Sequence, residues 1–263
     1  MQLKDKVVFI TGGARGFGRA VAEAVLKKGA KVCLADVNVE VGEATAKELQ
    51  ASCGPDNVVF VRCDVSDAAA FYDAFQSAVT KFGRIDVMCN NAGILDESIW
   101  EKQLDINFGG VVRGTVMALN HMRKDKGGRG GVIINTASMA GLRPTYWFPV
   151  YGASKSAVYH FTASWAQNPD LTSAEVRLVS ICPSGSKTAL LEVTDEQMIN
   201  IEHFKQVMEQ VSYCTVNQVV EAFLLAMEDD TIDGTAITIK GKEGVEKGNF
   251  LLDPTTKTYD IRK

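Results

Sequence analysis

The chain has 263 residues, of which 46% are hydrophobic and 23% are charged, a balance that indicates one globular domain with a sizeable core. Its net charge of −4 includes no cluster of lysine and arginine, which argues against nucleic acid as a partner, and no apolar run approaches membrane-spanning length. The first residues lead straight into a short apolar segment and do not resemble a signal or transit peptide, so we expect a cytoplasmic protein.

The cysteines and histidines point to neither disulfides nor a metal site. The six cysteines form no CxxC pattern and several lie in apolar runs, which favours buried free thiols in a reducing compartment. The three histidines, at 121, 160 and 203, are widely separated and give a metal no obvious set of ligands. We therefore expect no bound metal.

Short apolar runs alternate along the chain with longer amphipathic stretches. The predicted strands are Val7–Thr11, Lys31–Asp36, Val58–Asp64, Ile85–Asn90, Val132–Ser138, Val176–Cys182 and Ala236–Lys240. The predicted helices between them include Phe17–Lys28, Val39–Ala51, Ala68–Phe82, Leu104–Arg123 and Asn217–Met227. Nearly continuous apolar strands joined by helices are typical of a parallel sheet covered on both faces. The sequence thus predicts an α/β doubly wound domain with a mostly parallel, seven-stranded sheet.

A glycine-rich turn follows the first predicted strand and leads directly into a helix. Its glycines are Gly12, Gly13, Gly16 and Gly18. Glycines let a backbone approach a pyrophosphate closely, and a helix start offers free N–H groups and the positive end of the helix dipole. A glycine turn without a ligand is the alternative, but the second strand ends in Asp36, where a ribose-binding acid belongs. We therefore predict a dinucleotide site.

Asp36 also bears on which dinucleotide binds. A carboxylate accepts hydrogen bonds from the ribose hydroxyls and repels a 2′-phosphate, which favours NAD over NADP. Arg15 argues the other way, because its guanidinium could pair with a 2′-phosphate. We weigh Asp36 more heavily, since its charge would face the phosphate directly, and predict NAD.

Tyr151 and Lys155 lie four residues apart, so on a helix they share one face. A phenol ordinarily titrates near ~10, and a neighbouring ammonium lowers that pKa by favouring the phenolate. Such a pair can accept a proton from an alcohol. The pattern alone is weak, because Tyr259 and Lys263 have the same spacing at the chain end.

Five motifs in register resemble those of the short-chain dehydrogenases/reductases. They are Thr11-Gly12-x-x-x-Gly16-x-Gly18, Asn90-Asn91-Ala92-Gly93, Asn107, Ser138 and Tyr151-x-x-x-Lys155. The match runs from Lys6 to about Gly241. It implies a single Rossmann-type domain over 1–263, with a core at 1–187, a substrate lid at 188–215 and a tail at 242–263.

The resemblance also implies roles for individual residues. Tyr151 looks like the general acid/base, and Lys155 like the residue that lowers the pKa of Tyr151 and holds the nicotinamide ribose. Ser138 would hydrogen-bond the substrate oxygen, although a serine at a strand end can simply cap the next turn. Asn107 would help hold a water that relays protons to the lysine, although it can equally be a tolerated polar residue in an apolar helix.

The cofactor site implied by the family extends well beyond the glycine turn. Its members here are Gly12, Arg15, Gly16, Phe17, Gly18, Asp36, Val37, Cys63, Asp64, Val65, Asn91, Ala92, Gly93, Tyr151, Lys155, Pro183, Ser186 and Thr188. In a doubly wound sheet, ligands bind at the carboxyl ends of the strands, where these residues fall.

Within the family the chain is similar to a dehydrogenase that acts on a secondary alcohol of a long lipid chain. The predicted substrate contacts are Ser138, Phe148 and Tyr151. Three aromatic residues, Tyr146-Trp147-Phe148, either line an apolar pocket or pack the loop against the sheet or a second subunit. Leu190, Leu191 and Val193 either close such a pocket or form the buried face of a short helix. We expect a hydrophobic alcohol or ketone as substrate: a prostanoid, fatty alcohol, terpenoid, retinoid or steroid.

Three departures from the family pattern affect that expectation. Phe148 stands where the similar lipid dehydrogenase has a glutamine that hydrogen-bonds its substrate, so a polar contact is lost. The usual Pro-Gly reads Pro183-Ser184-Gly185, which predicts a different loop path beneath the nicotinamide. Asn168-Pro169 should end or kink the Tyr151 helix early.

Other questions stay open from the sequence alone. Members of the family usually pair through helices corresponding to Leu104–Arg123 and Tyr151–Gln167, so a homodimer is expected. A catalytically weak NAD-binding protein, or a structural or storage protein that keeps ancestral chemistry, is the alternative to an active enzyme.

Overall fold

The computed structural model describes residues 1–186, 188–210 and 212–248. Its centre is one sheet with the strand order β3-β2-β1-β4-β5-β6-β7-β8. All neighbouring strands are parallel except β7 and β8, which are antiparallel. The strands are β1 (Val7–Thr11), β2 (Lys31–Asp36), β3 (Val58–Arg62), β4 (Val87–Asn90), β5 (Gly131–Thr136), β6 (Val176–Pro183), β7 (Ala236–Lys240) and β8 (Gly244–Gly248).

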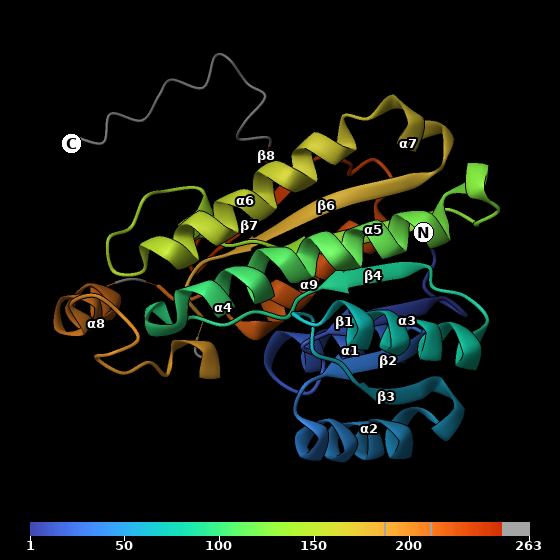
Figure 1. Ribbon diagram of the computed structural model, residues 1–263, viewed down its shortest axis with the longest axis horizontal. Helices are drawn as coiled ribbons and strands as arrows, with labels where there is room; N and C mark the ends of the chain where they lie inside the picture. The colour runs from blue at the N-terminus through green and yellow to red at the C-terminus, as the bar shows by residue number, and fades with distance from the viewer. Residues whose placement is uncertain (187, 211, 249–263) are drawn as a thin grey trace.

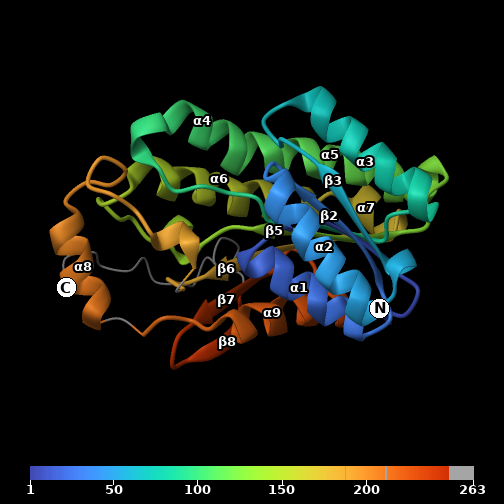
Figure 2. The same cartoon turned by 90° about the horizontal axis from the view of Figure 1, so that it is seen from below.

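Helices cover both faces of this sheet (Figures 1 and 2). α1, α2 and α9 pack on one face and α3, α5 and α6 on the other. The helices are α1 (Gly16–Lys27), α2 (Val39–Cys53), α3 (Ala68–Phe82), α4 (Trp100–Leu104), α5 (Gly110–Met122), α6 (Pro149–Ala166), α7 (Pro169–Ser173), α8 (Ile201–Gln210) and α9 (Val216–Glu228). Among the residues described, no helix combines the length and the apolar character needed to cross a membrane.

The predicted fold class is confirmed, with one strand more than the seven expected. β8 escaped detection because Gly244–Gly248 reads Gly-Val-Glu-Lys-Gly, which has neither alternation nor an apolar run. The strand forms only because β7 offers it an open edge. It occupies the beginning of the expected tail 242–263; the part from 249 onward lies outside the described residues.

The central strands are buried on both faces, as their composition requires, whereas the edge strand β3 is fully buried only at Val58. All five residues of β1 are buried, and Phe9 stacks against Phe71 of α3 with ring centroids 6.3 Å apart. On the opposite face, α1 and α9 bury valine, leucine and phenylalanine side chains against the same central strands. Because helices cover both faces of the sheet, a ligand can approach it at the carboxyl ends of the parallel strands.

The catalytic-motif helix α6 is joined to the sheet through buried amides. Asn135 of β5 donates from Nδ2 to the Thr162 hydroxyl at 2.9 Å and accepts from Asn90 Nδ2 at 2.8 Å. The helix ends at Ala166, and Pro169 begins the separate helix α7. The expected early stop before Asn168-Pro169 is therefore confirmed.

Candidate active site

The glycine turn closes tightly between β1 and α1. Gly12 has φ +63°, and a Cβ at Gly18 would collide with the Gly12 carbonyl oxygen, so the turn requires glycine at both positions. α1 begins at Gly16, and its N-cap residue Arg15 supplies no side-chain hydrogen bond to the helix. The first N–H groups of α1 are therefore suited to a phosphate. This geometry fits a dinucleotide pyrophosphate.

Asp36 lies at the carboxyl end of β2, beside that turn. Its Oδ2 accepts a hydrogen bond from the Ala14 N–H and its Oδ1 from the Asn38 N–H, each at 3.0 Å. These bonds fix the carboxylate between the glycine turn and the start of α2. Its neighbour Val37 is 59% exposed, while Arg15 is also on the surface. The carboxylate is thus held where a ribose would approach.

The segment after β3 forms the next part of this edge. Cys63 and Val65 are buried, and burial raises the pKa of the Cys63 thiol to about 12. Asp64 accepts hydrogen bonds from the Ser66 hydroxyl and N–H, which lower the pKa of its carboxyl. The three residues lie beside Asp36, because β3 is the neighbour of β2.

The end of β4 is tied to the end of β1. The N–H groups of Asn91 and Ala92 donate to the Thr11 hydroxyl at 2.9 and 3.0 Å, and Asn91 Nδ2 donates to the Thr11 carbonyl oxygen at 2.9 Å. The strand order reverses between β1 and β4, which is the position where doubly wound sheets bind their ligands. Gly93 follows, and a Cβ there would lie 3.3 Å from Lys155 Nζ. The cofactor edge therefore reaches the catalytic motif.

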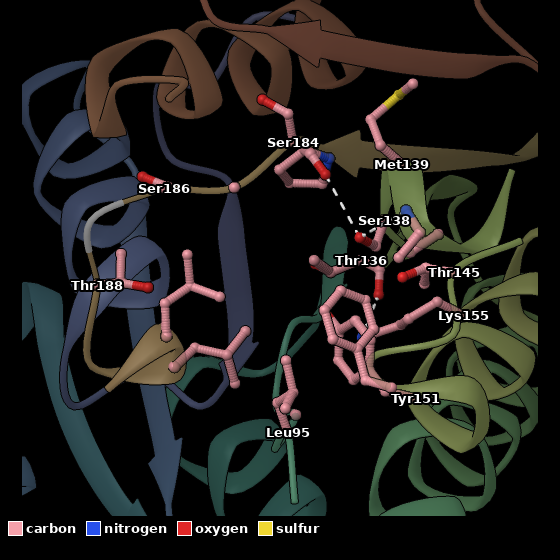
Figure 3. Close-up of a pocket in the computed structure, with 18 of the residues that line it drawn as sticks. Leu95, Thr136, Ser138, Met139, Thr145, Tyr151, Lys155, Ser184, Ser186 and Thr188 are labelled. Atoms are coloured by element: carbon pink, nitrogen blue, oxygen red, sulfur yellow. Dashed lines mark hydrogen bonds between the residues drawn. The ribbon is translucent and has the colours of Figure 1, made fainter. Parts of the chain in front are cut away.

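Tyr151, Lys155 and Ser138 converge at one side of a pocket (Figure 3). Tyr151 and Lys155 come from α6, with 6% and 3% of their surfaces exposed. Lys155 Nζ donates to the Thr136 carbonyl oxygen at 2.8 Å and lies 5.7 Å from the centroid of the Tyr151 ring. The Ser138 hydroxyl accepts from the Ala140 N–H at 3.1 Å, as a turn cap does, and donates to the Pro183 carbonyl oxygen at 3.4 Å. The cap that the sequence offered as one role for Ser138 is therefore present, and its hydrogen bond to a substrate oxygen stays a prediction.

Burial is the largest cause of the pKa shifts of Tyr151 and Lys155. It raises the pKa of Tyr151 to about 12, against the lowering effect of the Ser138 hydrogen bond. Burial also lowers the pKa of Lys155 to about 8. The direction for Tyr151 is opposite to the one expected from a neighbouring lysine, because the phenolate loses its solvation in this apolar setting.

Asn107 lies behind the pair, fully buried in a π-helical turn (η3, Asp105–Gly109) between α4 and α5. Its Oδ1 accepts from the Ile94 N–H at 2.8 Å, and its Nδ2 donates to the Ile94 carbonyl oxygen at 2.9 Å and to the Ser154 hydroxyl at 3.3 Å. π-turns inside helices frequently mark functional sites. Asn107 is therefore a polar side chain fixed by three hydrogen bonds near Lys155, and its part in a proton relay stays a prediction.

The pocket itself has a volume of about 390 Å³ and a mostly apolar wall. It joins the cofactor residues Phe17, Asn91 and Gly93 to the catalytic side chains. Ser186 and Thr188 line the side opposite Tyr151 (Figure 3), and Pro183 lies next to Ser138, whose hydroxyl donates to the Pro183 carbonyl oxygen at 3.4 Å. The remaining predicted cofactor residues form the adjoining edge outside the pocket wall: Gly12, Arg15, Gly16, Gly18, Asp36, Val37, Cys63, Asp64, Val65 and Ala92.

The aromatic segment before α6 divides between pocket and surface. Phe148 lines the pocket and packs edge-on against Tyr151, with ring centroids 5.6 Å apart at 90°. Trp147 also lines the pocket, whereas Tyr146 is 51% exposed and hydrogen-bonds His203 of α8. Leu190 and Leu191 line the pocket too, and Val193 packs in the same cluster.

Several residues that line the pocket were not predicted from the sequence. Leu95, Phe204 and Met208 line the pocket, and Thr136 binds Lys155 only through its backbone carbonyl. The two α8 residues lie four apart in a short amphipathic stretch, a signal that was available in the sequence. Figures 1 and 2 both show α8 at the end of the molecule where α4 and α6 begin.

Known proteins with similar sequences belong to the family that the motifs indicated. The family model of short chain dehydrogenases matches residues 6–199. The NAD(+)-dependent 15-hydroxyprostaglandin dehydrogenase of Homo sapiens is 39% identical over 260 residues, covering 97% of this chain and 98% of its own. An NADP-dependent (R)-specific alcohol dehydrogenase of Lentilactobacillus kefiri is 35% identical, covering 75% of this chain and 81% of its own. The resemblance inferred from the motifs, including that to the lipid-alcohol enzyme, is confirmed.

Solved structures give the same result. Levodione reductase superposes with a TM-score of 0.80 at 30% identity, covering 91% of this chain and 98% of its own. A short chain dehydrogenase/reductase from Burkholderia phymatum in complex with NAD superposes with a TM-score of 0.76 at 26% identity, covering 86% of each chain.

The lowered pKa of Lys155 predicts a pH-dependent stability. The unfolded chain binds this proton up to about 10.5, but the folded one releases it at about 8, so the folded state gains stability as pH rises between these two values and loses it as pH falls back to about 8. Relative to Lys155→Met, the wild-type free energy of unfolding should rise by about 2 kcal/mol between pH ~7 and ~9.5. Urea denaturation measures this, with the exposed Lys47→Met as control. Parallel curves for wild type and Lys155→Met would contradict a depressed pKa.

Proposed function

Because the chain belongs to the short chain dehydrogenase family, we propose that it is an NAD-dependent oxidoreductase that interconverts a hydrophobic, lipid-like alcohol and its carbonyl compound. One observation carries the proposal. Tyr151, Lys155 and Ser138 meet in an apolar pocket that opens onto a glycine turn built for a pyrophosphate. An alcohol bound there would have its hydroxyl between Tyr151 and Ser138, and its carbinol carbon toward the cofactor.

Tyr151 is the general acid/base in this proposal. In the oxidative direction its phenolate takes the hydroxyl proton, the electrons of the O–H bond form the carbonyl, and the carbinol carbon loses a hydride. NAD, when bound, accepts that hydride. Ser138 holds the oxygen while it changes from hydroxyl to carbonyl. In the reverse direction Tyr151 returns the proton.

The reaction needs the phenolate at a lower pH than burial alone allows. A pKa of about 12 leaves Tyr151 protonated near neutrality. Two positive charges favour its ionisation during the reaction: the ammonium of Lys155 and the ring of oxidised nicotinamide. Lys155 is itself close to its own titration, at about 8. Asn107, next to it, would help carry the released proton toward solvent through a water.

NAD is proposed over NADP because of Asp36. Its two hydrogen bonds hold the carboxylate in a fixed position beside the glycine turn. A 2′-phosphate there would meet a negative charge. The human relative is named for NAD(+) and the Lentilactobacillus relative for NADP, so both cofactors occur among the similar proteins.

The substrate is proposed from the pocket wall. Phe148, Trp147 and the α8 side chains give that wall an apolar character, which suits a lipid chain or ring. The human relative is named for a hydroxyprostaglandin. Phe148 presents a ring where an amide would hydrogen-bond such a substrate, so other lipid alcohols are equal candidates: fatty alcohols, terpenoids, retinoids and steroids. The segment 188–215 would act as the lid over them.

A catalytically weak NAD-binding protein is the second candidate. It is favoured by the raised pKa of Tyr151 and by the Ser184 departure beside the nicotinamide side of the pocket. The geometry of Lys155, Ser138 and Asn107 around Tyr151 speaks against it. Burying the Lys155 ammonium is unfavourable, as its lowered pKa shows, and a protein without turnover would gain nothing from it.

A turnover assay of wild type and Tyr151→Phe distinguishes an active dehydrogenase from a catalytically weak NAD-binding protein. Purified protein with NAD should reduce the cofactor, followed by absorbance, in the presence of at least one class of hydrophobic alcohol. Tyr151→Phe removes only the hydroxyl and should lower kcat by at least about 100-fold. Its dissociation constant for NAD should change little. Turnover of small sugars alone, or full activity of the variant, would contradict the proposal.

Asp36→Asn tests the choice of cofactor. The amide oxygen can still accept a hydrogen bond, but the negative charge is gone and Arg15 remains nearby. We expect the ratio of kcat/KM for NADP to that for NAD to rise by about tenfold or more. Asp56→Asn, an exposed change in the next loop, is the matched control. An unchanged ratio would mean that Asp36 does not select against the phosphate.

A cytoplasmic homodimer is proposed as the assembled form. α4 and α5 expose Trp100 and Val116, and Phe108, between these helices, packs edge-on against Phe161 of α6 with ring centroids 5.9 Å apart. Apolar side chains at a surface of this kind suit a two-fold contact between helices. Sedimentation at micromolar concentration should give twice the monomer mass of 28.5 kDa; a monomer would overturn this.

A further inference from the structure

The first turn of α6 lacks a cap of its own. Phe148 is the N-cap residue and supplies no side-chain hydrogen bond, and Pro149 has no N–H to satisfy. The first hydrogen bond inside the helix joins the Gly152 N–H to the Phe148 carbonyl oxygen at 2.9 Å. The N–H groups of Val150 and Tyr151 therefore need partners from elsewhere in the fold.

Glu97 supplies both partners from a different element. Its Oε2 accepts from the Val150 N–H and its Oε1 from the Tyr151 N–H, each at 2.9 Å. A carboxylate at a helix start is also favoured by the helix dipole. Because one of these bonds is made to Tyr151 itself, the anchor acts directly on the residue that would transfer the proton.

Gln103 holds Glu97 in place. Gln103 is fully buried, and its Nε2 donates to Glu97 Oε1 at 3.0 Å while its Oε1 accepts from the Asp96 N–H at 2.7 Å. Charge-assisted hydrogen bonds of this kind orient a carboxylate more strongly than neutral ones. The carboxylate is thus fixed before it meets α6.

Residues 188–199, which include the pocket-lining Thr188, Leu190 and Leu191 and are called the covering segment below, are hydrogen-bonded to Asp96 and Glu97. The Glu97 N–H donates to the Gln197 carbonyl oxygen at 3.0 Å, and Gln197 Nε2 donates to Asp96 Oδ2 at 2.8 Å. Two residues later, the Ile199 N–H donates to the Trp147 carbonyl oxygen at 2.8 Å. The covering segment, the loop after β4 and the start of α6 therefore meet at Asp96 and Glu97.

We propose that Glu97 is a positioning residue for the reaction, which fixes the first turn of α6 and with it Tyr151, and that Gln197 couples this anchor to the segment covering the pocket. The inference rests on the proposed role of Tyr151. It assigns no chemical step to Glu97, whose carboxylate accepts from N–H groups of Gln103, Val150 and Tyr151 in the part of the chain that the structure describes. Its effect should appear in the chemical step rather than in cofactor binding, because the glycine turn lies on β1 and α1.

Glu97→Ala and Glu97→Gln test the anchor, with the exposed Glu101→Gln of α4 as the matched control. Alanine removes both acceptors, and a displacement of about 1 Å at a reacting group can cost on the order of 100-fold. We expect kcat to fall at least about tenfold in Glu97→Ala and less in Glu97→Gln, which keeps one acceptor. The dissociation constant for NAD should stay within about twofold. Hydrogen exchange should rise at the Val150 and Tyr151 amides.

Two outcomes would overturn the role of Glu97. If exchange rises at both amides and kcat stays at the wild-type value, Glu97 is a helix cap with no part in positioning. If kcat and NAD affinity fall together in Glu97→Gln and the thermal transition also drops, its role is structural. Failure of the proposed function looks different, because wild type itself would then turn over no alcohol.

A double-mutant cycle tests the coupling. Gln197→Ala removes the Asp96 hydrogen bond together with the two bonds that Gln197 Oε1 accepts from Thr194, and we expect it mainly to raise KM for the alcohol. If the covering segment acts through Glu97, the loss of kcat/KM in the double variant Glu97→Ala/Gln197→Ala should be at least about threefold smaller than the product of the single losses. A double loss equal to that product would overturn the coupling.

Discussion

A buried ammonium next to a buried phenol is the interaction on which the rest of this structure depends. Lys155 and Tyr151 are almost fully enclosed, and enclosure works against the charged form of each. A lysine can be kept in such a place only if its protons find acceptors. The Thr136 carbonyl oxygen at the end of β5 provides one, and Gly93 lies against both Lys155 Nζ and the Asn107 amide oxygen. The fold therefore tolerates an unfavourable burial in order to bring a cation beside the phenol.

Much of the surrounding architecture serves to hold that arrangement still. The amide of Asn135 ties α6 to β5, the π-turn at Asn107 brings an amide behind Lys155, and the Glu97 carboxylate closes the helix start. Each of these groups satisfies backbone or side-chain atoms that burial would otherwise leave without partners. The apolar side chains of α8 and Phe148 pack in one cluster with Tyr151, so the polar contacts of the catalytic motif and the apolar pocket wall meet at the phenol. The apolar surroundings that raise the pKa of Tyr151 and lower that of Lys155 also form a pocket suited to an apolar substrate.

The two parts of the site differ in how readily the sequence revealed them. The glycine turn, Asp36, and the pair Tyr151 and Lys155 depend on short-range patterns: strand, turn and helix in succession, or two residues on one helix face. Local spacing decides these, so they could be read from the chain. Glu97, Gln103 and Gln197 carry no such pattern. Their neighbours in space are up to about a hundred positions away, and a glutamate at the start of a short helical segment is ordinary in sequence.

The sequence by itself determined the fold class and singled out the glycine turn, Asp36 and the pair Tyr151 and Lys155 as the predicted site, because apolar periodicity, glycine-dependent turns and spacing on one helix face are local constraints. It also determined the early end of α6 through Pro169. The tertiary structure alone decided the eighth strand, which needs the open edge of β7, and the composition of the pocket wall, where α8 closes over Phe148. It also decided the sign of the Tyr151 pKa shift. Local sequence predicts the charged neighbour, but the loss of solvation depends on everything that packs around the phenol.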